Sequence, residues 1–167
     1  MSYDPVKAHE YYMQHRQLKG RHSTKGFSQS QKELFAYAKN ELKGEKKSRN
    51  DAITARRKAN LAAIEAAKKA QKEQLSNAVK QQVDALRQSL KSASKEQKAA
   101  MRERINATIE QIRGDLKAKK AQLQSGAAAQ KETVKEQATA QKAQSQQKYE
   151  TDLDAAYEEI KGKKGKK

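Results

Sequence analysis

The three histidines are the first residues to test for chemistry, because imidazole serves both as a metal ligand and as an acid–base group near neutral pH. They are His9, His15 and His22. On a helix, His9 and His15 would lie about 240° apart around the axis, so they do not share a face. No carboxylate stands at a spacing that would complete a zinc site, and the chain has no cysteine. We therefore expect ordinary surface histidines, with no metal and no other cofactor.

Closely spaced carboxylates could in principle do acid–base work. The candidates, Asp152, Asp154, Glu158 and Glu159, fall in one amphipathic stretch beside a lysine-rich tail. General acid–base catalysis needs a desolvated pocket that raises the pKa of one carboxyl group, and a solvated helix offers none. The sequence also lacks a glycine-rich phosphate loop and a nucleophile motif. We expect no catalytic residues and no enzymatic activity.

Basic residues interleaved with aromatic ones are the more informative pattern. Arg16, Lys19, Arg21 and Lys25 stand near Tyr11, Tyr12 and Phe27, a mixture of charge and stacking surfaces that suits nucleic acid. The lysines of the tail can add only salt-sensitive, sequence-independent attraction. The alternative is that the aromatic residues form a small local core or a docking face for a larger partner. The candidate nucleic-acid-binding residues are Arg16, Lys19, Arg21, Lys25, Lys163, Lys164, Lys166 and Lys167, and the candidate partner-docking residues are Tyr11, Tyr12, Phe27, Phe35 and Tyr37.

The composition favours helices with narrow apolar seams. Leu, Ile, Val and Phe supply only 22 of the 167 residues, whereas Ala, Glu, Lys, Leu and Arg together supply 88. The formal net charge of +17 would repel itself unless a polyanion or an acidic partner lies nearby. No run approaches the roughly 18 apolar residues that a membrane helix needs, so we expect a soluble, intracellular protein without a membrane partner.

Capping signals divide the N-terminal part into two short helices. Asp4 and Pro5 are typical of a helix start, and Gly20 is placed to end that helix. After a polar linker, Ser30 and Glu33 form a capping-box pattern that predicts a second helix ending at Gly44. We therefore predict an aromatic-rich helical docking region over residues 1–44.

Two apolar seams follow, and they are mirror images of each other. The residue numbers of Leu90 and Met101 add to 191, and so do those of Leu86 and Ile105. Helices joined by a short turn near Ser94 would bring these residues face to face, which predicts an antiparallel hairpin over residues 51–125. The seam residues are Leu75, Val79, Val83, Leu86, Leu90, Met101, Ile105, Ile109, Ile112 and Leu116.

The remaining residues, 126–167, form a low-complexity region with a lysine-rich tail. Ser125 and Gly126 are predicted to end the second arm, and residues 127–148 are either a solvated helix or disordered. The fold class is therefore all-α, an extended, coiled-coil-like antiparallel hairpin with short N-terminal helices and a low-complexity basic C-terminal region. Because a hairpin with so few large residues is marginal, we also expect self-association into a homo-oligomer, or a larger partner protein.

The N-terminal sequence carries a resemblance. Tyr3 to Tyr12 reads YDPVKAHEYY and continues to LKGR at residues 18–21. This motif resembles the start of small basic helical proteins encoded in the structural gene clusters of tailed bacteriophages. The resemblance implies a virion-associated or assembly protein, located in the virion or the host cytoplasm, and it carries no catalytic residues over to this chain.

The function that we expect is a non-enzymatic virion structural or assembly protein with a scaffold-like role. Its N-terminal helices would dock on a larger virion protein or on another copy of the chain, and its basic surface would face nucleic acid or an acidic shell. The alternative is a small basic helical DNA-binding protein that is not part of a particle.

Overall fold

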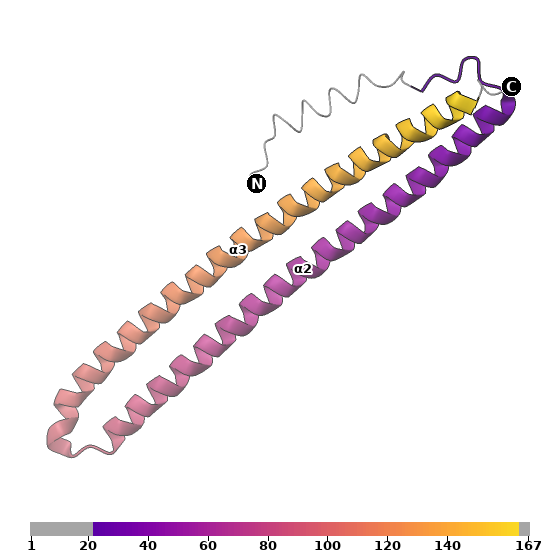
Figure 1. Cartoon of the computed structure of the whole chain (residues 1–167). Helices are drawn as coiled ribbons and strands as arrows, with labels where there is room; N and C mark the ends of the chain where they lie inside the picture. Colours follow the sequence, from indigo (N-terminus) through magenta and orange to yellow (C-terminus); the bar gives the residue numbers. More distant parts are fainter. Residues whose placement is uncertain (1–21, 164–167) are drawn as a thin grey trace. The chain divides into compact units, whose positions relative to one another are not determined.

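The computed structural model describes residues 22–163 of the chain. Within this range the backbone forms two α-helices, α2 (Gln29–Lys91) and α3 (Lys95–Gly162), and no strand (Figure 1). The helix predicted at residues 4–20 lies outside the described residues. Ala, Lys, Gln and Glu, which lose little side-chain entropy in a helix, fill most positions of both helices. The all-helical fold that the composition predicts is confirmed for this part of the chain.

A glycine turn precedes α2. The N–H of Phe27 donates to the carbonyl of Thr24 at 3.1 Å, which closes a four-residue turn. Gly26, the third residue of this turn, has a φ of 84°, a conformation that glycine adopts without steric cost. The turn directs the chain into the first residues of α2.

A reciprocal pair of hydrogen bonds caps the N-terminus of α2. The N–H of Gln31 donates to Ser28 Oγ at 3.2 Å, and the N–H of Ser28 donates to Gln31 Oε1 at 2.8 Å. This is a capping box, in which two otherwise unpaired N–H groups are satisfied. The sequence contains the same pattern two residues later, at Ser30 and Glu33, where we predicted the cap. That prediction was wrong by two residues.

Glycine does not end either helix where the sequence predicted an end. α2 continues through Gly44, and α3 continues through Gly126 to Gly162. A single glycine inside a helix costs about 1 kcal/mol relative to alanine, which the packing of the flanking turns offsets. Residues 127–148, for which the sequence allowed either helix or disorder, are part of α3.

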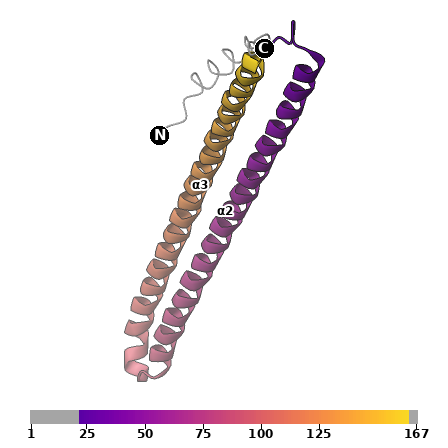
Figure 2. The ribbon, with the colours of Figure 1, turned by 45° about the vertical axis from the view of Figure 1, so that its right-hand side comes forward.

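The turn between the helices falls at residues 92–94. The N–H of Ala93 donates to the carbonyl of Leu90 at 3.3 Å, and the N–H of Gln97 donates to the carbonyl of Ser94 at 3.1 Å. Three residues suffice to reverse the chain, so α2 and α3 run antiparallel. This is the turn that the mirror-image seams predict, and the helical hairpin is confirmed (Figure 2).

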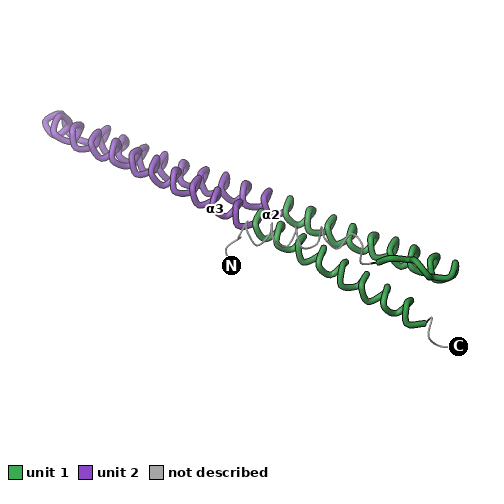
Figure 3. Tube along the Cα trace, turned by 90° about the horizontal axis from the view of Figure 1, so that it is seen from above, with its two compact units in different colours: residues 1–58, 135–167 green, residues 59–134 purple. Residues whose placement is uncertain are grey.

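The chain divides into two units, each built from a segment of α2 and a segment of α3 (Figure 3). Unit 1 comprises residues 1–58 and 135–167, and unit 2 comprises residues 59–134. The two units have different cores. We therefore describe each unit separately.

Unit 2 has an aliphatic core. Val83, Ile105 and Ile109 are its buried residues, with exposed fractions of 5%, 8% and 6%. Val83 comes from α2 and the two isoleucines from α3, so the seam joins the helices directly. The partly buried residues that pack against this core are Val79, Leu86, Leu90 and Met101.

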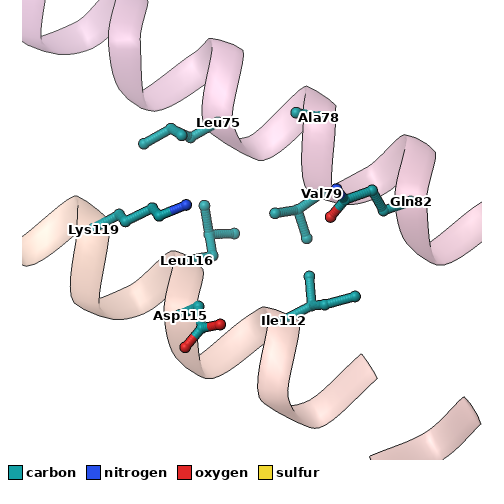
Figure 4. A pocket seen from close by; sticks show the side chains of 8 residues that line it. All are labelled: Leu75, Ala78, Val79, Gln82, Ile112, Asp115, Leu116 and Lys119. Carbon is teal, nitrogen blue, oxygen red and sulfur yellow. The ribbon is translucent and has the colours of Figure 1, made fainter. Parts of the chain in front are cut away.

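The rest of the predicted seam lies further from the turn within unit 2. Leu75 and Val79 on α2 point toward Ile112 and Leu116 on α3 (Figure 4). In both helices of this unit the covered positions recur every 11 residues, as from Ile64 to Leu75 to Leu86. Eleven residues complete three turns at 3.67 residues per turn, close to the natural period of an α-helix. The seam therefore stays on one face of each helix.

Unit 1 has an aromatic core. Phe35 on α2 packs against Leu153, Tyr157 and Ile160 on α3, and each of these four residues is 7% exposed. The ring of Phe35 meets that of Tyr157 edge-on, with centroids 5.5 Å apart. Phe27, Leu42 and Tyr149 complete this cluster as partly buried neighbours.

Candidate nucleic-acid interface

The most regular feature of the surface is a series of exposed lysines on α2. They recur every 11 residues, the same interval at which the seam of unit 2 repeats, so the lysines of that unit keep a constant angle to its seam. Two of these lysines belong to unit 1 and three to unit 2. They are Lys47, Lys58, Lys69, Lys80 and Lys91.

Two contacts across the seam of unit 2 mark one side of that unit. Lys131 Nζ on α3 donates to Glu65 Oε2 on α2 at 2.5 Å, and Lys72 Nζ donates to Gln124 Oε1 at 3.0 Å. Lys68 Nζ also lies 2.9 Å from Glu65 Oε1. One carboxylate is therefore shared by two lysines, and the surroundings of this site remain positive.

The charge state of Glu65 follows from these neighbours. The hydrogen bond from Lys131, followed by that from Lys68, lowers the pKa of its carboxyl group from 4.5 to about 2. The side chain is 52% exposed, so water screens much of this attraction. Glu65 is ionised at every physiological pH, and it neutralises one of the two lysines that hold it.

Polar contacts also cross the seam of unit 1. Arg49 on α2 donates from Nε to Ser145 Oγ and from Nη2 to the carbonyl of Ser145, both at 3.1 Å. Ser145 is 5% exposed and is the buried polar residue of the described chain. Lys46 Nζ lies 5.2 Å from the centroid of the Tyr149 ring, within the range of a cation–π contact. Burial, and secondarily the charge of Glu150, raises the pKa of Tyr149.

His22 belongs to the packing of unit 1. Its Nε2 lies 2.5 Å from Asp154 Oδ1, and its ring centroid is 5.0 Å from that of Tyr157. The hydroxyl of Tyr157 donates to the carbonyl of Ser23 at 2.6 Å. These contacts hold the segment before α2 against α3, and they place the ring of His22 beside the aromatic rings of Phe35 and Tyr157.

The predicted partner-docking residues have separate locations. Phe27 and Phe35 pack inside unit 1, and their rings lie 5.4 Å and 5.5 Å from the ring of Tyr157. Tyr37 is 65% exposed, and the hydrogen bond of its hydroxyl with Glu41 raises its pKa. Tyr11 and Tyr12 lie outside the described residues. The structure therefore brings two of the five residues together in a local core, which was the alternative interpretation of this pattern.

Of the predicted nucleic-acid-binding residues, only two fall within the described range. Lys25 is exposed in the turn before α2, and Lys163 is exposed with its Nζ 3.9 Å from Glu159 Oε1. The other six, Arg16, Lys19, Arg21, Lys164, Lys166 and Lys167, lie outside the described residues.

The surface hollows beside the seam carry little chemistry. One of about 290 Å³ is lined by Leu75, Ala78 and Val79 with Gln82, Asp115 and Lys119 (Figure 4). Another of about 220 Å³ includes Ala67, Gln71 and Gly126. Both are widely open, and neither holds a nucleophile beside a base. Within residues 22–163, no group of three or more acidic residues, histidines or cysteines could hold a metal ion.

The lysine series was missed by the sequence reasoning, although its signal is present there. The search looked for local clusters of charge, whereas these lysines are 11 residues apart. The signal is visible only when the repeat of the seam is known. Eleven residues complete three turns of an α-helix, so residues at this interval lie on one face, whether they are seam residues or lysines.

Across residues 22–163, neither helix has an apolar stretch that could cross a membrane. No protein-family model matches the chain, and no curated protein or solved structure is detectably similar to it.

Proposed function

We propose that this protein is a non-enzymatic structural or assembly protein of a bacteriophage particle, in which a coiled-coil-like hairpin acts as a spacer with a scaffold-like role. Its basic surface faces packaged nucleic acid or an acidic shell. The observation that carries the proposal is the division of residues between seam and surface. Large apolar side chains lie mainly in the seam, and exposed lysines recur along α2.

The net charge of +17 supports a polyanionic partner, because so large an excess of one sign repels itself unless negative charge lies nearby. Phosphate backbones are the most concentrated source of negative charge that such a surface meets. The N-terminal resemblance to proteins of phage structural gene clusters favours a particle as the setting.

Docking would use the parts of the N-terminal region that the core of unit 1 leaves uncovered. Leu34 is 50% exposed and Tyr37 is 65% exposed, and their spacing of three residues puts them on neighbouring positions of one helix face. We propose that these two residues belong to the docking region predicted over residues 1–44, which would bind a larger virion protein. Phe27 and Phe35 contribute by holding this part of α2 in place.

The experiment that tests the proposal is a salt titration of DNA binding by the purified protein, with an acidic protein of the size of serum albumin as competitor. We expect binding that falls steeply with salt and that resists the competitor. Weak binding, or equal displacement by the acidic protein, would contradict a surface that faces nucleic acid.

A DNA-binding protein outside any particle is the second candidate, because the exposed lysines support it equally well. A deletion of residues 1–21 separates the two functions and leaves Phe35 in its core. Loss of association with a virion protein, with DNA binding retained, would favour the structural protein. Unchanged association would favour the second candidate.

A further inference from the structure

The charged side chains of unit 2 are unevenly distributed between the two sides of its seam. One side carries the contacts of Glu65 with Lys131 and of Lys72 with Gln124. We call this the basic side. The other side carries the two hollows, and we call it the neutral side.

On α2, the basic side is a row of lysines. Lys69 lies one turn from both Glu65 and Lys72, and Lys80 and Lys91 follow at intervals of 11 residues on the same face. All three are exposed.

On α3, the basic side is a row of arginines. The position of Gln124 recurs 11 and 22 residues earlier, at Arg113 and Arg102, and both are exposed. Lys117 lies four residues from Arg113 and extends this row. Because the helices run antiparallel, the arginine row of α3 accompanies the lysine row of α2 along the same side of unit 2.

The neutral side has a different composition. Its hollows are lined mainly by alanine, glutamine and aliphatic residues (Figure 4). Asp115 and Lys119 carry opposite charges in one hollow, and Lys68, which is paired with Glu65, lines the other. Arg104 is the further charged residue on this side that the test below uses. The two sides therefore differ in their exposed charged residues, whereas the apolar seam between them is common to both.

We infer that the basic side of unit 2 binds the phosphate backbones of duplex DNA, with α2 lying along the duplex axis. Lys69 and Lys91 are 22 residues apart, which is about 33 Å at 1.5 Å per residue. One turn of B-DNA measures about 34 Å. Along one side of a duplex, each turn exposes two phosphate backbones, so the average distance between successive backbones is about 17 Å. Successive lysines of the row are about 16.5 Å apart, which matches this average distance.

Unit 2 favours a duplex over a single strand because it contains no aromatic residue. Residues 59–134 include no Phe, Tyr or Trp. Single strands are held largely by the stacking of bases on aromatic rings, which this unit cannot provide. Its contacts are limited to phosphates, so the binding is independent of sequence.

Three acidic residues limit the strength of this surface. On α2, Glu73 and Asp84 follow Lys69 and Lys80 by four residues, on the flank of the lysine row that lies away from the seam. On α3, Glu110 lies one turn before Arg113 on the same face. The basic side keeps a net positive charge, because its lysines and arginines outnumber these acidic residues and the arginine row of α3 lies on the seam side of the lysine row. We therefore expect modest affinity at physiological salt and a steep rise when the salt is lowered.

This inference rests on the proposed function and adds the side of the molecule and the class of nucleic acid. The test uses the full chain in two double variants with equal loss of charge. K80Q/R113Q removes one lysine and one arginine from the basic side, and R104Q/K119Q removes one of each from the neutral side. All four residues are exposed. Circular dichroism establishes that both variants keep their helicity.

Binding to a 40-base-pair duplex is measured by fluorescence anisotropy over a range of salt concentrations. We expect the slope of log Kobs against log salt to become shallower by about 2 for K80Q/R113Q, and to stay nearly unchanged for R104Q/K119Q. We also expect a single strand of equal length to bind more weakly than the duplex.

Three results would overturn the inference. Equal changes of slope in the two variants would mean that charge acts without regard to side. Equal or tighter binding of the single strand would contradict the match to the duplex. Both results leave the proposed function standing, whereas an unaltered protein that fails to bind DNA at low salt would overturn the DNA-facing surface as well.

Discussion

Unit 1 and unit 2 hold segments of the same two helices together by different chemistry. Unit 1 uses aromatic rings, which meet at defined angles, and side chains that hydrogen-bond across the seam, as Arg49 does with Ser145. Unit 2 uses aliphatic residues such as Val83 and Ile109, with an ion pair at the edge of the seam.

The difference concerns how each unit fixes its register. The fork of Arg49 fits one serine in one position, and a shift along the helix would leave Ser145 buried without its partner. The aliphatic core of unit 2 has no such two-pronged polar contact among its buried residues. Its register is set by the short turn at residues 92–94, which joins its two helices directly.

The largest effect that we expect comes from the aromatic core. Phe35→Ala should lower the free energy of unfolding by about 3 kcal/mol, because it removes the ring that Leu153, Tyr157 and Ile160 cover. Urea denaturation measures the loss. Hydrogen exchange should then show lost protection in unit 1 and retained protection in unit 2.

The matched control is Leu34→Ala at the preceding position, where the side chain is 50% exposed. It should change stability by no more than about 0.5 kcal/mol. If both variants lost the same stability, or if unit 2 lost its protection together with unit 1, the contrast between the two cores would be wrong.

The next effect tests register in unit 1. Arg49→Ala should cost about 1.5–3 kcal/mol, because it removes a charged donor from two oxygens of Ser145 and leaves the buried Oγ without its partner. Arg49→Lys should recover little of this loss, since an ammonium group cannot reproduce the two-pronged geometry. Urea denaturation of both variants checks this, with the exposed Arg56→Ala as control. Full recovery by lysine would show that charge alone holds the helices at this point.

A smaller effect of opposite sign is expected in unit 2. Gly114→Ala should raise the free energy of unfolding by about 0.5–1 kcal/mol, because an added Cβ meets nothing within 4 Å and alanine favours the helix. Thermal denaturation measures the gain. Gly26→Ala, where φ is 84°, should lower stability instead. A destabilised Gly114→Ala would mean that this part of α3 has a closer neighbour than the structure shows.

The smallest effect concerns the ion pair of unit 2. Glu65 has a pKa of about 2 in the folded protein and an ordinary value of 4.5. Its contribution to stability is therefore fully present above pH 4.5 and is lost as the pH falls through about 2. The difference in Tm between the unaltered protein and Glu65→Gln should shrink over this interval. A difference that stayed constant down to pH 2 would refute the lowered pKa.

The register of the hairpin could be predicted from the sequence because large apolar residues are scarce. With few aliphatic residues, the mirror symmetry of Leu86 with Ile105 about a short turn leaves little choice of pairing. The helix ends were less predictable. Gly44 and Gly126 look like stops because local propensity disfavours them, and the packing that carries the helix past them depends on residues far along the chain.

The candidate site was predictable only in part, for a similar reason. Phe35 stands near basic and aromatic neighbours in the sequence, which suggested docking, whereas the buried residues of its cluster lie on α3, more than 110 residues away. Extending the antiparallel pairing of the seam to the last turns of α3 would have placed these residues opposite the first turns of α2. The lysines at 11-residue intervals were within reach once the period of the seam was known.

The segregation of aromatic residues gives this protein a built-in optical label. Its six tyrosines and two phenylalanines all fall within the residue ranges of unit 1, and it has no tryptophan. Tyrosine fluorescence and near-ultraviolet circular dichroism therefore carry no signal from unit 2, whereas far-ultraviolet circular dichroism reports on the helices of both units. Melting curves recorded in the near-ultraviolet and in the far-ultraviolet would separate the unfolding of the two units without any dye.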